Sequence, residues 1–189
     1  MMRTARLLLI PASPAALRAE LDSPAALADT LGVDVPPSWP PDLYDADAVR
    51  WTLNWLEENP EAREWGFYYI AESSALGGDR PRLVGAGGYK GAPDATGAVE
   101  IGYSILAERR RRGYAREAVA AWLARAFADS HVTRVVAHTL PHLAPSIGVL
   151  QSTGFELVGA GTDSQEPDAI RFELPRARYA LAIATALSR

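Results

Sequence analysis

Along much of the chain, apolar residues stand either at every second position or in short runs between turn-forming residues. Both patterns are typical of β-strands, because successive side chains of a strand point to opposite faces of a sheet. Clusters that contain glycine, proline, asparagine, aspartate or serine separate many of these segments and mark turns. The pattern predicts seven strands, at residues 6–10, 67–71, 83–89, 99–105, 133–139, 155–158 and 170–174.

Other segments repeat apolar residues every three or four positions, which is the spacing of a buried helix face. Ser13 and Ser23 are each followed by a proline, and this pair favours the start of a helix. The predicted helices are two short ones ending near Gly32, one from Asp45 or Asp47 to about Asn59, one ending near Ala128, one from about Pro145 to Gly154, and at 179–187 either a short helix or a frayed tail.

This order of elements predicts a mixed α/β fold in which residues 67–105 form an antiparallel meander. A chain of 189 residues suits one domain with a sizeable core. Its apolar content of 48% and charged content of 22% are those of an ordinary globular protein. We therefore expect a single domain at residues 1–189, with 176–189 as a C-terminal tail or short helix.

Charge and cysteine content narrow the classes of partner. The net charge of −4 argues against broad binding to nucleic acids or anionic membranes. The sequence has no cysteine, which excludes disulfides, thiolate metal sites and cysteine nucleophiles and fits a reducing compartment. The apolar run at 7–10 ends at Pro11, too early for a signal peptide or a membrane span. We expect a cytoplasmic protein with a small-molecule partner.

Positive charge is concentrated at residues 109–112, where four arginines precede Gly113 and an alanine-rich helical pattern. The start of a helix disfavours nearby cations, so an anion is expected beside these arginines. Free N–H groups at the helix start, a glycine that lets a ligand approach the backbone, and guanidinium groups together predict a phosphate or pyrophosphate site. The alternatives are a solvated charged loop, and an RNA contact that would weaken steeply with salt.

The pattern Arg110-x-x-Gly113-x-Ala115, between a strand and a helix, resembles the acetyl-CoA signature of the GNAT superfamily of N-acetyltransferases. Nearly the whole chain is similar in element order to this family, specifically to its ribosomal-protein N-terminal acetyltransferases. The resemblance implies an α/β fold whose mostly antiparallel seven-stranded sheet is flanked by helices and splayed between strands four and five, with acetyl-CoA (coenzyme A) in the gap. It assigns pyrophosphate to the backbone at 111–116 and pantetheine to 105–107. The cofactor-binding residues that it implies are Ile105, Leu106, Ala107, Arg110, Arg111, Arg112, Gly113, Tyr114, Ala115 and Arg116.

Residues 99–105 look like the fourth strand of that family, where a glutamate often removes the proton of the acceptor amine. Glu100 is therefore our candidate base, and His138 is a second candidate with a suitable ordinary pKa. A base is needed because an ammonium is not nucleophilic. The implied reaction is direct transfer of acetyl to the primary amine of a peptide N-terminus or small molecule. The alternative for Glu100 is an exposed strand carboxylate without a catalytic role.

A third match, at residues 145–155, is similar to the cofactor-contacting helix of the family but departs from it at two positions. Leu143 stands where this branch commonly has asparagine, and Leu150 where other branches have a tyrosine acid. Neither leucine can donate a proton, so the departing thiolate would rely on Ser146, on water, or on no specific acid, and Ser146 is the candidate catalytic side chain of this helix. The departures also keep open a second function, that of a catalytically impaired acyl-CoA-binding or sensor protein of the same fold.

The acceptor site is the least specified part of the sequence. Its candidate residues are aromatic: Trp39, Tyr44, Trp51 and Trp55. Aromatic residues at helical spacing are also typical of core packing, so both readings stay open. No metal site is expected, because His138 and His142 are separated by Pro141 and lack a pattern of further ligands. The identity of the amine and the oligomeric state, including a homodimer, stay open.

Overall fold

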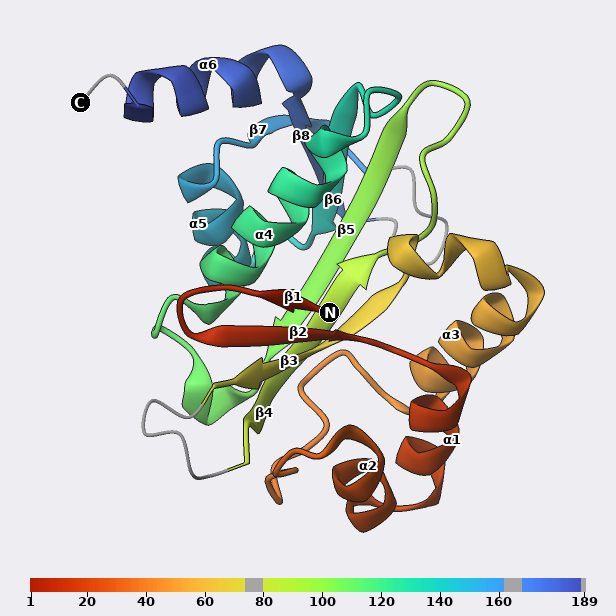
Figure 1. Cartoon of the computed structure of the whole chain (residues 1–189). Coiled ribbons are helices and arrows are strands. Elements are labelled where there is room, and N and C mark those ends of the chain that lie inside the picture. Colours follow the sequence, from red (N-terminus) through yellow and green to blue (C-terminus); the bar gives the residue numbers. More distant parts are fainter. Residues whose placement is uncertain (74–79, 162–167, 188–189) are drawn as a thin grey trace.

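The computed structural model describes residues 1–73, 80–161 and 168–187 and contains one eight-stranded sheet with helices on its two faces (Figure 1). The strands are β1 (Met2–Arg3), β2 (Leu7–Pro11), β3 (Phe67–Glu72), β4 (Arg82–Tyr89), β5 (Ala98–Ile105), β6 (Arg134–Thr139), β7 (Glu156–Ala160) and β8 (Ile170–Pro175). The helices are α1 (Pro14–Asp22), α2 (Pro24–Leu31), α3 (Ala46–Glu58), α4 (Tyr114–Ala128), α5 (Ala144–Ser152) and α6 (Arg176–Leu187), with 3₁₀ turns η1 (Pro60–Trp65) and η2 (Ala107–Arg109).

The order of strands across the sheet is β1-β2-β3-β4-β5-β6-β8-β7. All neighbours are antiparallel except β5 and β6, and β3, β4 and β5 form the predicted meander. The predicted mixed α/β fold is confirmed, with one strand more than expected. The additional strand, β1, has two residues, too few to give a periodic pattern in the sequence.

The sheet opens between β5 and β6. These strands pair through only four residue pairs, from Ala98 with Arg134 to Ile101 with Ala137. Beyond that point β5 continues to Ile105 along β4, while β6 continues to Thr139 along β8. The β6-facing edge of residues 102–105 therefore has no strand partner within the described chain. This is the splay that the resemblance implied between the fourth and fifth predicted strands, which are β5 and β6.

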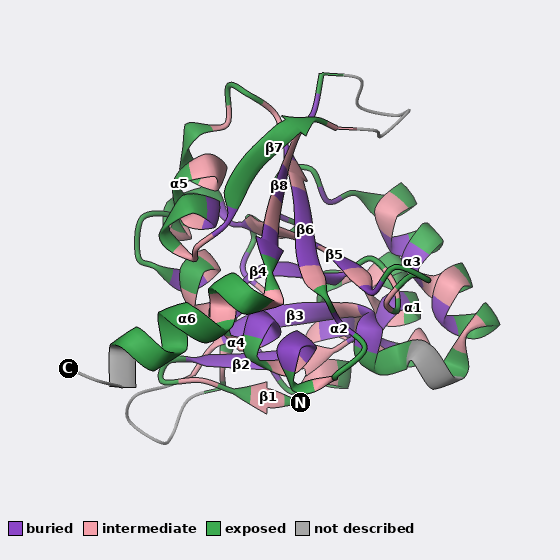
Figure 2. Ribbon diagram, turned by 90° about the horizontal axis from the view of Figure 1, so that it is seen from above, coloured by how far each residue is buried: buried purple, intermediate pink, exposed green. Residues whose placement is uncertain are grey.

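Two apolar clusters cover the two faces of the sheet (Figure 2). Successive side chains of β2 point to opposite faces of the sheet, so Leu7 and Leu9 belong to one cluster and Leu8 belongs to the other. The first cluster contains the buried face of α4, including the fully buried Trp122. The second contains buried residues of α1, α2 and α3, such as Leu17 of α1. The sheet is thus the middle layer, and the splay has α4 beside one face.

The helix starts that were predicted from serine-proline pairs are confirmed. The Oγ atoms of Ser13 and Ser23 accept the N–H groups of Ala16 and Ala26 at 3.2 and 3.1 Å, which caps α1 and α2. Oδ1 of Asp45 caps α3 in the same way. These caps fix where the helices of the second cluster begin, and hence where α3 lies beside β4 and β5.

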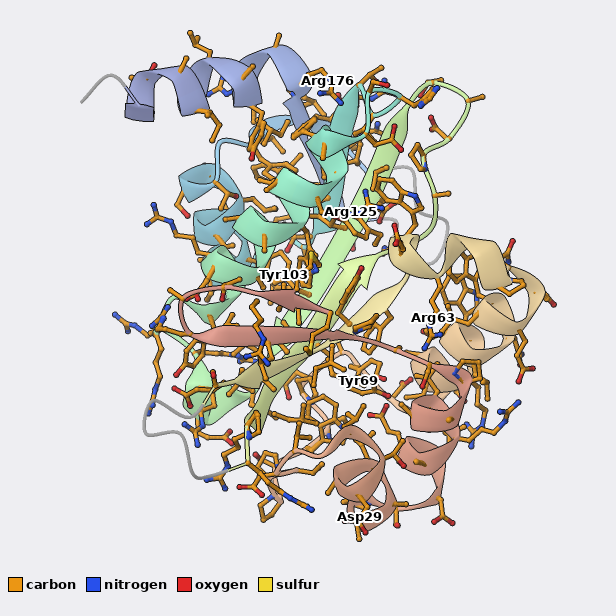
Figure 3. The ribbon with its side chains drawn as sticks, viewed as in Figure 1. Asp29, Arg63, Tyr69, Tyr103, Arg125 and Arg176 are labelled. Atoms are coloured by element: carbon orange, nitrogen blue, oxygen red, sulfur yellow. The ribbon has the colours of Figure 1, made fainter. Side chains whose placement is uncertain are left out.

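The C-terminal segment is a helix, α6, rather than a frayed tail. Arg176 at its start donates to the carbonyl oxygens of Phe127 and Val132, each at 2.8 Å (Figure 3). The ring of Tyr179 stacks on that of Phe127, with 4.6 Å between centroids. These contacts hold the first turn of α6 against the end of α4. Among the described residues, no helix has both the length and the apolar composition needed to cross a membrane.

Candidate active site

The arginine run forms the connection from η2 to α4, as the sequence predicted. Arg111 and Gly113 both have a left-handed backbone, with φ of 62° and 82°. Gly113 is the N-cap of α4, and a Cβ added there would lie 3.3 Å from Nη2 of Arg6. Such a conformation is ordinary for glycine and rare for other residues. Turns that contain left-handed residues can form concave sites in which successive backbone N–H groups bind an anion.

The N–H groups of residues 111–116 have no hydrogen-bond acceptor among the residues that the structure describes. The following donor, the N–H of Glu117, bonds to the Gly113 carbonyl at 3.0 Å and begins the helical ladder. A series of free amides at the start of a 15-residue helix is suited to a phosphate or pyrophosphate group. The residues present therefore fit the phosphate-bearing cofactor that the resemblance implies.

Arg6 holds this loop in place from the other end of the chain. Its guanidinium forms an ion pair with Glu117 at 2.7 Å and donates to the Arg112 carbonyl at 2.9 Å. It also lies over the ring of Tyr114, 5.0 Å from the centroid. Sequence reasoning missed Arg6, because no local pattern links it to residues more than a hundred positions later. Arg6 is a positioning residue for the predicted phosphate site.

The arginines of the run have different surroundings. Arg109 pairs with Glu72 at 3.3 Å, and Arg110 pairs with Asp42 at 2.6 Å and donates to the Ile105 carbonyl at 3.0 Å. Arg111, Arg112 and Arg116 are exposed. Arg110 was an expected cofactor-binding residue, but in this structure its side chain bonds to other residues of the protein. The exposed arginines are the ones placed to meet an anion from solution.

The end of β5 leads from the splay to this loop. Ile105 and Leu106 are buried and Ala107 is exposed, and the N–H of Leu106 bonds to the Val84 carbonyl at 3.0 Å. Their backbone continues the edge that β6 leaves unpaired. The segment expected to run along pantetheine therefore borders the opening in the sheet. Residues 105–116 connect this opening to the free amides of the arginine loop.

The two candidate bases lie next to each other. Oε1 of Glu100 is 3.1 Å from Nδ1 of His138 and 2.6 Å from Nζ of Lys90. The His138 side chain is 9% exposed and that of Glu100 is 29% exposed. Glu100 is on β5 and His138 on β6, close to the point where these strands part. The structure joins the alternatives of the sequence analysis into one pair, whose nearest polar atoms lie within ion-pair distance.

A cavity of about 880 Å³ lies between α3 and the strands β4 and β5. Tyr44, Trp51 and Trp55 line it, as does Lys90, which contacts Glu100. Trp51 is 57% exposed, which is unusual for a tryptophan that serves only to pack a core. The other lining residues are Leu43, Asp45, Asp47, Ala48, Thr52, Gly66, Phe67, Ala86, Gly87, Gly88, Tyr89, Gly102, Tyr103 and Ser104.

Trp39 is the one acceptor candidate that does not line this cavity. Its indole N–H donates to Glu20 at 2.7 Å, and the hydroxyls of Tyr44 and Tyr69 donate to the same carboxylate at 2.9 and 2.7 Å. The ring of Tyr44 also stacks on Phe67, with 4.8 Å between centroids. Trp39 and Glu20 therefore support the cavity wall from behind, by holding Tyr44.

We expect Glu20 to make stability depend on pH. Burial raises the pKa of Glu20, against the opposing effect of its hydrogen bonds from Tyr69, Tyr44 and Trp39. The folded state then holds a proton that the unfolded chain releases, so the free energy of unfolding falls as pH rises from the ordinary carboxyl range through the raised pKa. Urea unfolding at several pH values should show this fall in the wild type and a smaller one in Glu20→Gln. Equal pH dependence in both would contradict it.

The start of α5 faces β5 across the splay. Leu143 is its N-cap and provides no side-chain hydrogen bond, and Leu150 is buried in the first cluster. Ser146 lies near Tyr103 of β5, whose hydroxyl is 3.3 Å from the Ser146 carbonyl oxygen and 3.5 Å from its Oγ. The sequence identified Ser146 but gave no role to Tyr103. In the described ranges, histidine, aspartate and glutamate side chains form no group of three or more that could hold a metal ion.

Comparison with known proteins shows the family of the chain. The family model of the acetyltransferase (GNAT) domain matches residues 6–156. The uncharacterized N-acetyltransferase YjdG of Bacillus subtilis (strain 168) is 27% identical over 128 residues, which cover 67% of this chain and 72% of YjdG.

Two solved structures have a similar fold. The ribosomal-protein-S5-alanine acetyltransferase of Vibrio fischeri has a TM-score of 0.62 and 17% identity, with 95% of this chain and 97% of that chain covered. The spermidine N-acetyltransferase of Vibrio cholerae, in complex with CoA and spermine, has a TM-score of 0.62 and 13% identity, with coverage of 94% and 99%. At these identities the two structures bear on the fold alone.

Proposed function

The chain belongs to the GNAT acetyltransferase family and is an acyltransferase, and from this premise we propose that it transfers an acetyl group directly from acetyl-CoA to a primary amine. The observation that carries the proposal is the continuous path from the free amides of residues 111–116, along the open edge of β5, to the Glu100–His138 pair. The proposed phosphate site, the opening in the sheet and the proposed base are then all carried by β5 and the loop that follows it.

In this proposal the backbone at 111–116 holds the pyrophosphate of acetyl-CoA, with Gly113 and Arg111 giving the loop its shape. When bound, acetyl-CoA supplies the acetyl group as an activated thioester. The edge of β5 at 102–105 holds the pantetheine arm in the splay, where β6 leaves backbone groups unpaired. Most of the rate is expected to come from holding the acetyl group beside the amine in a fixed orientation.

Glu100 is proposed to accept the proton of the acceptor ammonium, directly or through a water molecule. His138 holds the carboxylate from the β6 side at 3.1 Å, and Lys90 holds it at 2.6 Å from the cavity side. Because Lys90 lines the cavity and contacts Glu100, the cavity is next to the base. The amine would therefore enter from the aromatic cavity and lose its proton toward Glu100.

The cavity between α3 and β4 is proposed to hold the body of the acceptor. Trp51, Trp55 and Tyr44 offer apolar and aromatic faces, and Asp45, which caps α3, and Asp47, which pairs with Arg50 at 2.8 Å, also belong to its lining. Aromatic faces and carboxylates both favour a cationic amine. The acceptor is either a peptide N-terminus or a small-molecule amine. A single domain at 1–189, and a cytoplasmic location in keeping with the absence of cysteine, complete the proposal.

Acetyl-CoA is expected to raise the thermal unfolding temperature of the protein. At about 100 times its Kd, a ligand that binds only the folded state adds roughly 2.7 kcal/mol to the free energy of unfolding. The test is a thermal shift titration with acetyl-CoA, beside a titration with acetate as a control that lacks the phosphates. No shift with acetyl-CoA at millimolar concentration would overturn the proposed cofactor.

A turnover assay distinguishes an enzyme from an acyl-CoA sensor, the alternative function that Leu143 and Leu150 leave possible. Release of free thiol from acetyl-CoA is measured over a panel of amines that includes polyamines and short peptides with free N-termini. Transfer to any of them supports the enzyme. A clear thermal shift without thiol release across the panel would favour the sensor.

A further inference from the structure

Tyr103 extends from β5 across the opening in the sheet. It packs against the first apolar cluster and is also one of the residues that line the acceptor cavity. Its hydroxyl is 3.3 Å from the carbonyl oxygen of Ser146 and 3.5 Å from its Oγ. Ser146 is in the first turn of α5, on the other side of the splay. One phenol group therefore joins the two walls of the proposed cofactor slot.

The reaction needs a proton donor in this slot. When an amine displaces CoA, the C–S bond breaks and sulfur leaves as a thiolate, which requires stabilisation or a proton. The positive start of α5 favours an anion there. Leu143 and Leu150, the residues of α5 at usual polar positions, cannot supply a proton. The Tyr103 hydroxyl lies at this helix start, 3.3 Å from the Ser146 carbonyl oxygen, and Tyr103 is one of the residues that line the acceptor cavity.

We propose that Tyr103 is the catalytic acid that delivers a proton to the sulfur of the departing CoA. The inference rests on the proposed acetyltransferase function. After the first ammonium proton has passed to Glu100 and on to solvent, the neutral amine nitrogen forms its bond to the acetyl carbon, and the C–S bond breaks with its electron pair going to sulfur. The second nitrogen proton then passes to Glu100 and is released to solvent. The O–H proton of Tyr103 moves to that sulfur, and the phenolate takes a proton back from solvent, so that charge and atoms balance over the cycle.

The surroundings of Tyr103 keep it in the donor form. Burial raises the pKa of Tyr103 to about 12, against a smaller lowering by the hydrogen bond with Ser146. The phenol is therefore protonated throughout the neutral and mildly alkaline range. Ser146 is then a positioning residue, because its carbonyl oxygen accepts from the Tyr103 hydroxyl at 3.3 Å and its Oγ lies 3.5 Å away, which holds the hydroxyl at the start of α5.

The test uses Tyr103→Phe, which keeps the ring and removes only the hydroxyl. We expect kcat to fall by about a hundredfold, the lower end of the usual effect of an acid or base, with the Kd of acetyl-CoA within threefold of wild type. A second readout needs no turnover: the pH titration of the thiol of bound CoA, followed by the ultraviolet absorbance of its thiolate. In wild type the Tyr103 hydroxyl donates to the thiolate and lowers the pKa of that thiol relative to Tyr103→Phe.

Tyr68→Phe is the matched control, because its hydroxyl donates to the Glu64 carbonyl at 3.0 Å in the same cluster, and Tyr68 does not line the acceptor cavity. It should leave kcat and the thiol titration unchanged. Wild-type kcat in Tyr103→Phe, or the same thiol titration in both Tyr103→Phe and wild type, would overturn the role of Tyr103. Failure of the proposed function is separate, since it would appear as absent CoA binding or absent turnover in the wild-type protein.

Discussion

Replacement of Gly113 by valine is expected to weaken CoA binding by about a hundredfold, which corresponds to about 2.8 kcal/mol. Gly113 has a φ of 82°, a region that costs L-residues roughly 1–2 kcal/mol and is especially unfavourable for a β-branched side chain. The valine would move the loop to another conformation and turn the amides of residues 111–116 away from a shared ligand. Loss of one or two hydrogen bonds to a charged group, each stabilising by about 1.5–3 kcal/mol, accounts for the expected size.

Gly32→Val is the matched control for this experiment. Gly32 also has a left-handed backbone, with φ of 66°, and a Cβ there would meet no atom within 4 Å. It ends α2 and takes no part in the arginine loop. Both variants carry the same kind of backbone strain, so both should lose stability. Only Gly113→Val should also lose affinity for CoA in titration calorimetry.

Single arginine variants complete the series. Arg111→Ala and Arg112→Ala each remove one exposed cation and leave the backbone amides in place, so each should weaken CoA binding less than Gly113→Val does. If an arginine variant lost more affinity than the glycine variant, the loop would be a patch of charge rather than a backbone site. The proposed role of the amides would then be wrong, although acetyl-CoA could still be the cofactor.

Glu100→Gln is expected to lower kcat by about a hundredfold or more at neutral pH, without changing the KM for acetyl-CoA. Glutamine has nearly the shape of glutamate but cannot accept the proton of an ammonium. The variant also removes the charge that Lys90 and His138 contact at 2.6 and 3.1 Å. Attack on the thioester needs an unprotonated amine, and a higher pH supplies that form without a base. The activity of the variant should therefore recover as pH approaches the pKa of the free amine. A pH profile of kcat for both proteins measures this.

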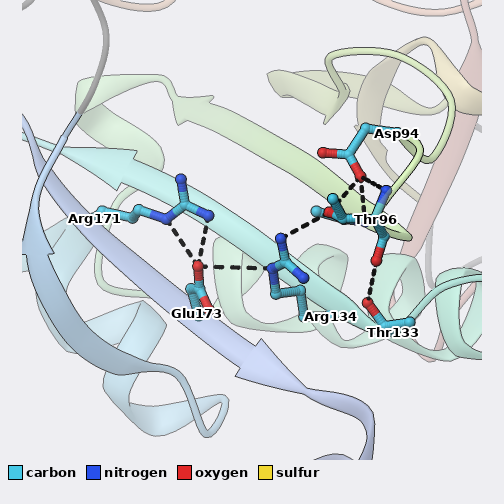
Figure 4. A network of polar contacts seen from close by, with 7 residues as sticks. Asp94, Thr96, Thr133, Arg134, Arg171 and Glu173 are labelled. Atoms are coloured by element: carbon cyan, nitrogen blue, oxygen red, sulfur yellow. Dashed lines mark hydrogen bonds and ion pairs between the residues drawn. The ribbon is translucent and has the colours of Figure 1, made fainter.

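Glu173→Gln is the control that separates a catalytic loss from a structural one. Glu100 pairs with Val136 in register, and Val136 pairs with Glu173, so both carboxylates are on one face of the sheet. Glu173 is held by Arg171 at 2.8 Å and lies 3.7 Å from Arg134, in a network that includes Thr96 and Asp94 (Figure 4). Its replacement should reduce stability and leave kcat unchanged. Equal effects of the two variants on kcat, or wild-type kcat in Glu100→Gln at every pH, would remove the assignment of Glu100.

Much of the fold follows from local patterns in the sequence. Alternating or short continuous apolar runs predicted β2 to β8, and the serine-proline pairs predicted where α1 and α2 begin. The order of elements and the arginine-glycine signature also pointed to the family to which the chain belongs. The two-residue β1 was missed, because so short a strand has no period and owes its place to pairing with β2.

Local sequence patterns predicted only part of the candidate site. Arg6 was missed because it reaches the arginine loop through space, by its contacts with Glu117 and Arg112. Trp39 was expected beside Tyr44, Trp51 and Trp55, but its indole N–H bonds to Glu20 instead of lining the cavity. The sequence shows that a residue is aromatic or charged. It does not show which of several residues distant in the chain that side chain contacts.

The sequence by itself determined all the strands except β1, the helix starts and the family, and it predicted the loop at 111–116 as a phosphate site, because helix starts, apolar strand patterns and left-handed glycines are properties of neighbouring residues. Only the tertiary structure decided which side chains share a site. It joined Glu100 to His138 through the register of β5 and β6, and it placed the Tyr103 hydroxyl against α5 where those strands part. Both outcomes depend on how far two strands remain paired, which is set by packing across the whole sheet.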